Sequence, residues 1–267
     1  LPGHNERVAG HAGEDAEREA GRPDDAGIDL DLPPLTARSV LLSILLGSRP
    51  PQLPVRVLVR TGELFGISEG AVRVALSRMA AEGEVDAHGG SYALNDRFVH
   101  RRAALEAARR PPLRPWSGRW EVAVLADDLD NGTRAELSEG LAGLHLARWR
   151  DGVWTRPDNL RRPWPAALAV RCERLVAVPD TDPVALAAEL WDLDGWAARA
   201  GAILRRLRSE RAEPIRFALG AAAVRHLRAE PLLPPALLPP GWPATALRRA
   251  YGAYERDLAR LLGSAGG

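Results

Sequence analysis

The sequence contains no lysine, so all 36 of its basic side chains are arginine. The absence of lysine excludes two chemistries that need its amine, a phosphate-binding P-loop and a lysine Schiff base. Cysteine is nearly absent as well. The single residue of this type, Cys172, excludes an intramolecular disulfide and any metal site built from several cysteines.

Long hydrophobic runs are also missing. No apolar stretch approaches the roughly 18 residues of a membrane span, and residues 1–21 contain no hydrophobic segment of the kind found in a signal peptide. We therefore expect a cytoplasmic protein. The sequence also lacks HExxH, GxSxG and any Cys/His set with metal-ligand spacing. We expect no enzyme activity, no cofactor and no metal, with one alternative considered below.

Charge is almost balanced over the whole chain. The net charge is +1, so only a local concentration of arginine could attract nucleic acid. The 267 residues are enough for two or three small domains. Residues 1–32 hold nine acidic side chains against three arginines and few large apolar residues, a composition typical of a disordered acidic tail.

The next stretch predicts three helices. Residues 35–47 have apolar side chains at helical spacing and end at a glycine. Residues 53–66 are ambiguous, because Val-Arg-Val-Leu-Val-Arg alternates like a strand, whereas Pro54 and the apolar spacing favour a helix. Ser68 is a typical cap for a third helix, which Gly83 ends.

A predicted hairpin follows the third helix. Two short extended runs in EVDAHGGSYAL are joined by Gly89-Gly90, a typical tight-turn pair. The order helix, helix, turn, helix, hairpin is that of a winged helix-turn-helix, which we assign to residues 33–110 together with the helix that ends before Pro111-Pro112.

Two further modules complete an α+β fold. The pattern of residues 111–182 predicts a strand, a helix, two strands around Asp151-Gly152 and a final strand. This order predicts a ferredoxin-like α+β domain. Residues 183–267 are mainly helical, with an irregularity near 192–195, and form a predicted helical C-terminal domain.

The third helix has two different faces when its residues are placed at about 100° each. Val72, Ala75, Leu76 and Met79 form the side that must pack on the preceding helices. The opposite side is small, carries no acidic residue, and is formed by Gly70, Arg73, Val74, Ser77, Arg78 and Ala81. A helix that enters the ~12 Å major groove of DNA needs such a face.

DNA binding is therefore the favoured interpretation of this helix and hairpin. Arg73 is the candidate for a bidentate guanine contact, Ser77 for a base or phosphate contact, and Arg78 for a phosphate contact. The full set of candidate DNA-binding residues is Ser68, Glu69, Arg73, Ser77, Arg78, His88 and Ser91. The alternative is a solvated face of an ordinary surface helix. Two features favour DNA binding: the hairpin and a basic run after it. In this run only Glu106 opposes six arginines, which are Arg97, Arg101, Arg102, Arg109, Arg110 and Arg114.

These stretches also resemble a known family. LTARSVLLSILLG, GISEGAVRVALSRMAAEG, GGSYAL, PWSGRW, GVWTRPDNL, WDLDGWAARAGAIL and EPLLPPALLPPGWPATALRRAYGAYERDL are similar, in this order, to signature stretches of the PaaX-type regulators, bacterial repressors of phenylacetic acid catabolism and their relatives. The likeness runs from about residue 35 to residue 262. It implies a winged-helix domain, a central Cas2-like ferredoxin domain and a helical C-terminal domain.

The resemblance also implies a homodimer on a palindromic operator, with release from DNA by phenylacetyl-CoA in the best-known branch. Two departures weaken the transfer of specificity. The hairpin usually carries arginines in this family, whereas here only His88 could be cationic, and Glu84 stands where tryptophan is frequent. The operator, the regulated genes and the effector are therefore not predicted.

Two other functions remain as alternatives. The first is a metal-dependent, Cas2-like nuclease. Asp127 and Asp128 follow the first central strand, and at this place the Cas2 nucleases hold a metal across a dimer. The stretch DDLDNG is, however, also typical of a turn. The winged domain could instead serve as a protein-interaction module.

Effector-binding residues are not predicted, although the junction of the central and C-terminal domains is a common place for ligand sites. Some of the eight tryptophans, all after residue 115, could line a site there, although a core role is favoured for each. The cationic side chains that could hold the phosphates of an acyl-CoA, or simply keep the surface soluble, are Arg148, Arg150, Arg156, Arg161 and Arg162.

Overall fold

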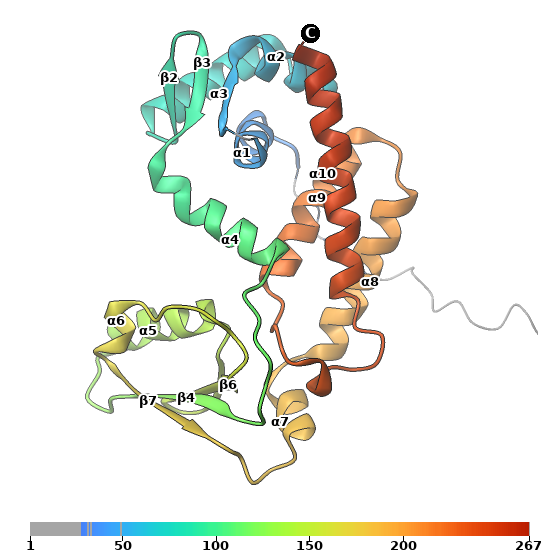
Figure 1. Ribbon diagram of the computed structural model, residues 1–267. Coiled ribbons are helices and arrows are strands. Elements are labelled where there is room, and N and C mark those ends of the chain that lie inside the picture. Colours follow the sequence, from blue (N-terminus) through green and yellow to red (C-terminus); the bar gives the residue numbers. More distant parts are fainter. Residues whose placement is uncertain (1–27, 31, 33, 49, 267) are drawn as a thin grey trace, which may run out of the picture.

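A computed structural model describes residues 28–30, 32, 34–48 and 50–266. It is a mixed α+β protein with two antiparallel sheets (Figure 1). The predicted acidic tail falls largely on residues 1–27, which lie outside the described part of the chain. In the first described segment, residues 28–30, Leu30 is buried against the C-terminal helices. Arg199 donates hydrogen bonds to the carbonyls of Asp29 and Leu30.

The N-terminal unit combines helices with a small sheet. Its elements are α1 (Ala37–Gly47), β1 (Gln52–Pro54), α2 (Val55–Leu64), α3 (Glu69–Ala81), β2 (Val85–His88), β3 (Ser91–Leu94), the short 3-10 helix η1 (Asp96–Phe98) and α4 (Val99–Arg109). The strand order is β1-β3-β2, antiparallel throughout. The ambiguous stretch is therefore mostly helix, because Pro54 both ends β1 and precedes the first turn of α2.

The core of this unit is formed by the predicted apolar faces. Leu41 and Leu45 of α1 and Leu58 of α2 pack against the inner side of α3. That inner side consists of Val72, Leu76 and Met79, each at most 1% exposed. The inner face predicted for α3 is therefore confirmed, and its other side must point away from the unit.

The central unit is a four-stranded sheet with helices on one face. Its elements are β4 (Trp120–Leu125), α5 (Asn131–Gly143), β5 (Ala147–Arg150), β6 (Val153–Pro157), α6 (Ala166–Ala169) and β7 (Cys172–Ala177). The strand order is β5-β6-β4-β7 and every neighbouring pair is antiparallel. Leu137 and Leu141 of α5 and Leu168 of α6 cover the face that carries Ala123 and Leu125 (Figure 1).

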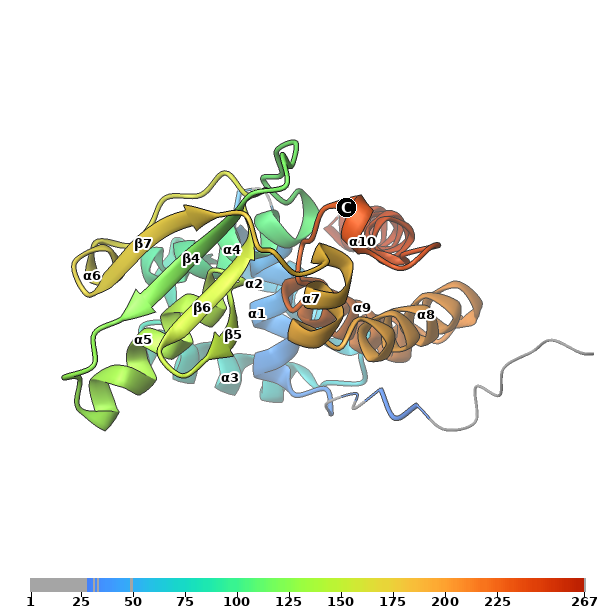
Figure 2. The ribbon, with the colours of Figure 1, turned by 90° about the horizontal axis from the view of Figure 1, so that it is seen from below.

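The C-terminal unit is helical. Its elements are α7 (Pro183–Leu190), α8 (Leu193–Ser209), α9 (Glu213–Arg228), the 3-10 helix η2 (Pro235–Leu237) and α10 (Ala244–Gly266). The predicted irregularity is the break between α7 and α8, where Asp192 caps α8 by accepting a hydrogen bond from the amide of Gly195. Figures 1 and 2 show α8, α9 and α10 side by side, with the end of α10 against the N-terminal unit.

A buried arginine joins the central sheet to the C-terminal unit. Arg156 is 0% exposed and donates hydrogen bonds to Asn159 Oδ1 and to the carbonyls of His145, Pro157 and Leu232. Its neighbour Arg162 is nearly buried and pairs with Glu121. Our interpretation of Arg156 and Arg162 as phosphate donors or solubilising charges is therefore wrong, because both are committed to internal partners. Arg148, Arg150 and Arg161 are exposed.

His226 follows an arginine in the last turn of α9, but its own side chain is only 9% exposed. Its ring stacks on Trp196 with centroids 4.4 Å apart, and Nε2 lies 2.9 Å from the Trp196 carbonyl oxygen. Burial lowers the pKa of His226, so the ring is neutral at pH 7.

Among the described residues, no helix combines the length and the apolar character needed to cross a membrane.

Candidate nucleic-acid interface

The start of α3 is fixed by local signals. Gly66 has a φ of +72°, a conformation that glycine adopts without strain and that turns the chain after α2. Ser68 then caps α3 by accepting a hydrogen bond from the amide of Ala71 at 3.4 Å. The helix packs closely on α2 at Gly62, where a Cβ atom would lie 2.4 Å from Val72 Cγ2. The close packing of α2 on α3 therefore depends on glycine at this position, because any larger residue would meet Val72.

The outer side of α3 is open to solvent. The exposed residues of the predicted outer face are Gly70, Arg73, Val74, Ser77, Arg78 and Ala81. Val74 is a large apolar side chain with 53% of its surface exposed, and a Cβ at Gly70 would meet no atom within 4 Å. No part of the described chain encloses this face, so a duplex could approach Arg73 and Ser77.

The prediction that the outer face of α3 carries no acidic residue is wrong. Glu69, in the first turn of α3, accepts a hydrogen bond from Arg73 Nε at 2.8 Å and lies 2.7 Å from Arg73 Nη2. Both side chains remain more than half exposed. An exposed pair of this spacing contributes only about 0.3–0.5 kcal/mol, so it holds Arg73 weakly.

The hairpin adjoins the end of α3. Gly83 reverses the chain with a φ of +63°, and Gly89 and Gly90 have φ values of +50° and +80°, which form the tight turn that the pair predicts. His88 pairs with Ser91 across this turn. His88 is exposed, whereas Ser91 is half-buried.

Glu84 has a structural role at the base of the hairpin. It is 5% exposed, and Arg38 of α1 donates a hydrogen bond from Nε to its carboxylate at 2.9 Å. This hydrogen bond raises the pKa of the Arg38 guanidinium. Glu84 therefore ties α1 to the base of the hairpin by a charged pair.

The basic run after the hairpin is less basic than the sequence suggests. Arg109 pairs with Glu255 of α10 as well as with Glu106, and Arg114 pairs with Asp158. Our statement that only Glu106 opposes this run is wrong, because partners distant in sequence neutralise two of its members. Arg102 is half-buried and Arg110 is exposed, and the side chains of Arg97 and Arg101 lie outside the description.

Two exposed arginines of the N-terminal unit were not among the candidate DNA-binding residues predicted from the sequence. Arg56 and Arg60 lie one turn apart on α2, and both are exposed. The signal was present in Val-Arg-Val-Leu-Val-Arg, because residues four apart share a side of a helix, but the strand-like alternation obscured it.

The two aspartates of the alternative metal site lie at the start of the turn after β4. Asp127 and Asp128 are exposed in the turn after β4, and Asp130 caps α5 by accepting hydrogen bonds from the amide and hydroxyl of Thr133. Within the described ranges, no group of three or more His, Cys, Asp or Glu side chains could hold a metal ion.

Tryptophans occupy the junction between the central and C-terminal units. Trp120 is fully buried in an apolar cluster that includes Leu186, Leu193 and Leu233, and its ring lies 6.4 Å from that of Trp191. Trp196 lies between His226 and Trp242 in a stacked arrangement. These rings act mainly in packing, the role that the sequence analysis favoured.

These features define an α+β protein whose N-terminal unit presents an exposed, arginine-bearing helix next to a glycine hairpin. Residues 36–98, which contain that helix and hairpin, match the family described as PaaX-like protein. The chain is also similar to the solved structure of the uncharacterized protein Rv0674 from Mycobacterium tuberculosis. The two sequences are 37% identical, the match covers 88% of this chain and 100% of that one, and the TM-score is 0.79. A search of curated proteins finds no match. The chain belongs to the PaaX-like family.

Proposed function

We propose that this protein is a sequence-specific DNA-binding transcriptional regulator that binds double-stranded operator DNA as a homodimer and represses a catabolic operon under the control of a small effector. The observation that carries the proposal is the outer face of α3, which is small, exposed and carries Arg73 and Arg78. The match to the PaaX-like family covers the same residues.

The element order supports a finer description of the fold. In the N-terminal unit, α1, α2 and α3 followed by the β2–β3 hairpin have the order of a winged helix-turn-helix. In the central unit, the strand order β5-β6-β4-β7 with one helix after the first strand and one before the last is that of a ferredoxin-like, Cas2-like domain. A helical domain follows. The domain boundaries at 33–110, 111–182 and 183–267 belong to this proposal.

Individual side chains of α3 receive different roles. Arg73 reads a guanine, because its planar guanidinium can donate two parallel hydrogen bonds in the major groove. Arg78 contacts phosphate and Ser77 contacts a base or phosphate. Val74 adds an apolar contact suited to a thymine methyl group. His88 and Ser91 contribute weakly, because the hairpin turn carries no arginine.

Control by an effector follows from a change in the spacing of two recognition helices. A homodimer with two-fold symmetry requires half-sites whose separation matches that spacing. A ligand that binds one arrangement of the units better than another shifts the population toward it. For a repressor, the favoured arrangement is the one that no longer fits the operator.

The test is selection of bound duplexes from random oligonucleotides with the full-length chain. We expect one enriched palindromic sequence. On that sequence, Arg78→Ala should lower the slope of log K against log salt by about 0.9, the value for one lost phosphate contact. Arg249→Ala, which removes an exposed arginine from α10, is the matched control and should leave the slope unchanged. Absence of any enriched sequence would refute the proposal and favour a protein-interaction role.

A further inference from the structure

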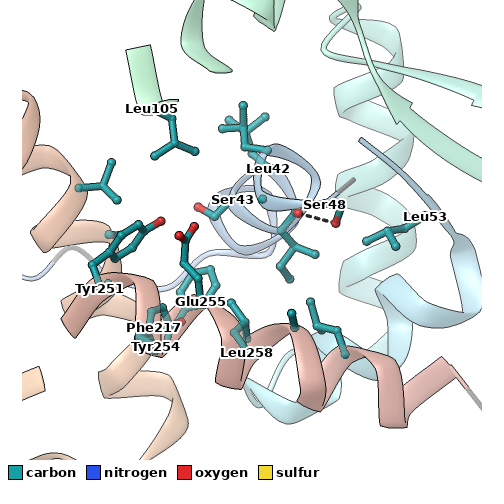
Figure 3. A pocket seen from close by; sticks show the side chains of 18 of the residues that line it. Leu42, Ser43, Ser48, Leu53, Leu105, Phe217, Tyr251, Tyr254, Glu255 and Leu258 are labelled. Atoms are coloured by element: carbon teal, nitrogen blue, oxygen red, sulfur yellow. Dashed lines mark hydrogen bonds between the residues drawn. The ribbon is translucent and has the colours of Figure 1, made fainter. Parts of the chain in front are cut away.

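A cavity of about 920 Å³ lies between the N-terminal unit and the C-terminal helices. Its walls come mainly from α1, α9 and α10, with Leu105 of α4 on one side. Most of the lining is apolar, and Figure 3 shows Leu42, Leu53, Phe217 and Leu258 around the cavity. This volume lies in the range of roughly 300–1,000 Å³ that is typical of sites for small organic ligands.

One part of the cavity wall carries several polar groups. Figure 3 shows Ser43 of α1 close to Tyr251 and Glu255 of α10. Arg225 and Arg228, in the last turn of α9, also line the cavity. Because Arg109 forms an ion pair with Glu255, the charge of that carboxylate is compensated. Arg228 therefore adds a positive charge to the wall of the cavity.

We infer that this cavity binds a small apolar anion, with its hydrocarbon or aromatic body in the apolar part and its acidic group near Arg228. Burial of the body supplies the affinity, since each apolar Å² removed from water contributes about 25 cal/mol. The Arg228 guanidinium fixes the orientation, because it matches the geometry of a carboxylate or a similar oxyanion. A neutral molecule of the same shape binds more weakly.

The cavity shares a wall with the packing of α3. Leu42 lines the cavity and also belongs to the apolar cluster that contains Leu76 and Met79 of α3. On the other side, Phe217 lines the cavity and contacts Phe65 at the end of α2, with ring centroids 4.7 Å apart. A bound ligand therefore contacts both the N-terminal unit and α9. The consequence that it alters DNA affinity rests on the proposed function.

The experiment uses two fluorescent probes that share one aromatic body. 8-Anilinonaphthalene-1-sulfonate carries a sulfonate, and N-phenyl-1-naphthylamine lacks it. Fluorescence titration of the full-length protein should show saturable binding of the anionic probe with one site per chain, and weaker binding of the neutral probe.

Two filled-cavity variants locate the site. Ala221→Phe on α9 and Ala259→Phe on α10 place a ring at exposed positions of the cavity wall, from two different helices. Each should weaken binding of both probes at least about ten-fold, equivalent to ~1.4 kcal/mol. Ala198→Phe, the same change at an exposed position of α8 outside the lining, should have no effect.

A charge variant tests the anionic group. Arg228→Gln should weaken the sulfonate probe by about two- to five-fold, the range of an exposed ion pair, and leave the neutral probe unchanged. Arg249→Gln is the matched control. Probe binding that persists in both filled-cavity variants would overturn the site, and equal binding of the two probes would overturn the preference for an anion.

The DNA measurement is kept separate from the binding measurement. On the selected operator, the sulfonate probe should shift the affinity for DNA in the wild-type chain and not in Ala221→Phe. If selection yields no operator, the proposed function fails, while the probe titrations still decide whether the cavity is a ligand site.

Discussion

The ion pair between Glu69 and Arg73 allows a quantitative test of base reading. In the free protein Arg73 is held by Glu69, with Nε 2.8 Å from the carboxylate. The pair contributes about 0.3–0.5 kcal/mol, whereas a bidentate contact to guanine discriminates by about 1–3 kcal/mol. Since the contact exceeds the cost of breaking the pair, Arg73 can transfer from Glu69 to the base.

The single variants should therefore change affinity in opposite directions. Arg73→Ala should weaken binding to the selected operator by about 1–3 kcal/mol, or about 5- to 150-fold, with a much smaller loss on random duplex. Glu69→Ala should strengthen operator binding by about 0.3–0.5 kcal/mol, because Arg73 no longer has to leave a partner. The double variant should resemble Arg73→Ala, which makes the two effects non-additive.

The assay is fluorescence anisotropy with labelled operator and random duplex at one fixed salt concentration, since affinity for DNA depends steeply on salt. Arg249→Ala is again the control for loss of an exposed arginine. Equal losses for Arg73→Ala on both duplexes would refute base reading by this residue. A loss of operator affinity in Glu69→Ala would refute the restraining role and assign Glu69 a direct contact, such as acceptance of a hydrogen bond from cytosine.

Three further predictions concern stability, measured by urea unfolding. Arg156→Met should destabilise the protein by about 3–5 kcal/mol, since it removes four hydrogen bonds from a buried, charged donor, and a cost below ~1 kcal/mol would contradict this account. Burial and the neighbouring Arg156 lower the pKa of His145 to about 4. The unfolded state, with a pKa of about 6.5, therefore gains the proton first, and stability is complete above pH 6.5 and falls toward pH 4. Between pH 7 and pH 5 the loss is about 2 kcal/mol. His145→Asn, which suits the φ of +62° at this position, should lack that loss, and an unchanged pH profile would exclude His145 as its source. Gly62→Ala should cost about 1–2 kcal/mol through the clash with Val72, whereas Gly70→Ala, with open space around it, should gain up to ~1 kcal/mol. Similar effects of both alanines would refute the close packing of α2 and α3.

Most secondary structure could be predicted because its signals are local. Ser68 and Gly83 delimit α3, and Gly89-Gly90 forms the hairpin turn, since caps and tight turns depend on a few neighbouring residues. The inner face of α3 followed from helical spacing alone. The family likeness rested on short stretches in a fixed order, and the match at residues 36–98 agrees with it.

The errors concern side chains whose partners are distant in sequence. Arg156 and Arg162 were interpreted as phosphate donors or solubilising charges, but Arg156 donates to the Leu232 carbonyl and Arg162 pairs with Glu121. Glu106 was expected to be the only acidic residue opposing the basic run, but Arg109 also pairs with Glu255 of α10. Helical spacing gives the direction of a side chain, whereas its partner depends on how the helices pack.

The sequence by itself determined the order of the elements, the apolar face of α3 and the absence of lysine and disulfide chemistry, because these depend on residue type and on spacings within one or two turns. Only the tertiary structure decided that Arg156 is buried and that a cavity is lined by residues of α1, α9 and α10. Both depend on contacts between segments far apart in the chain, and no local spacing encodes the volume that is left where packed helices diverge.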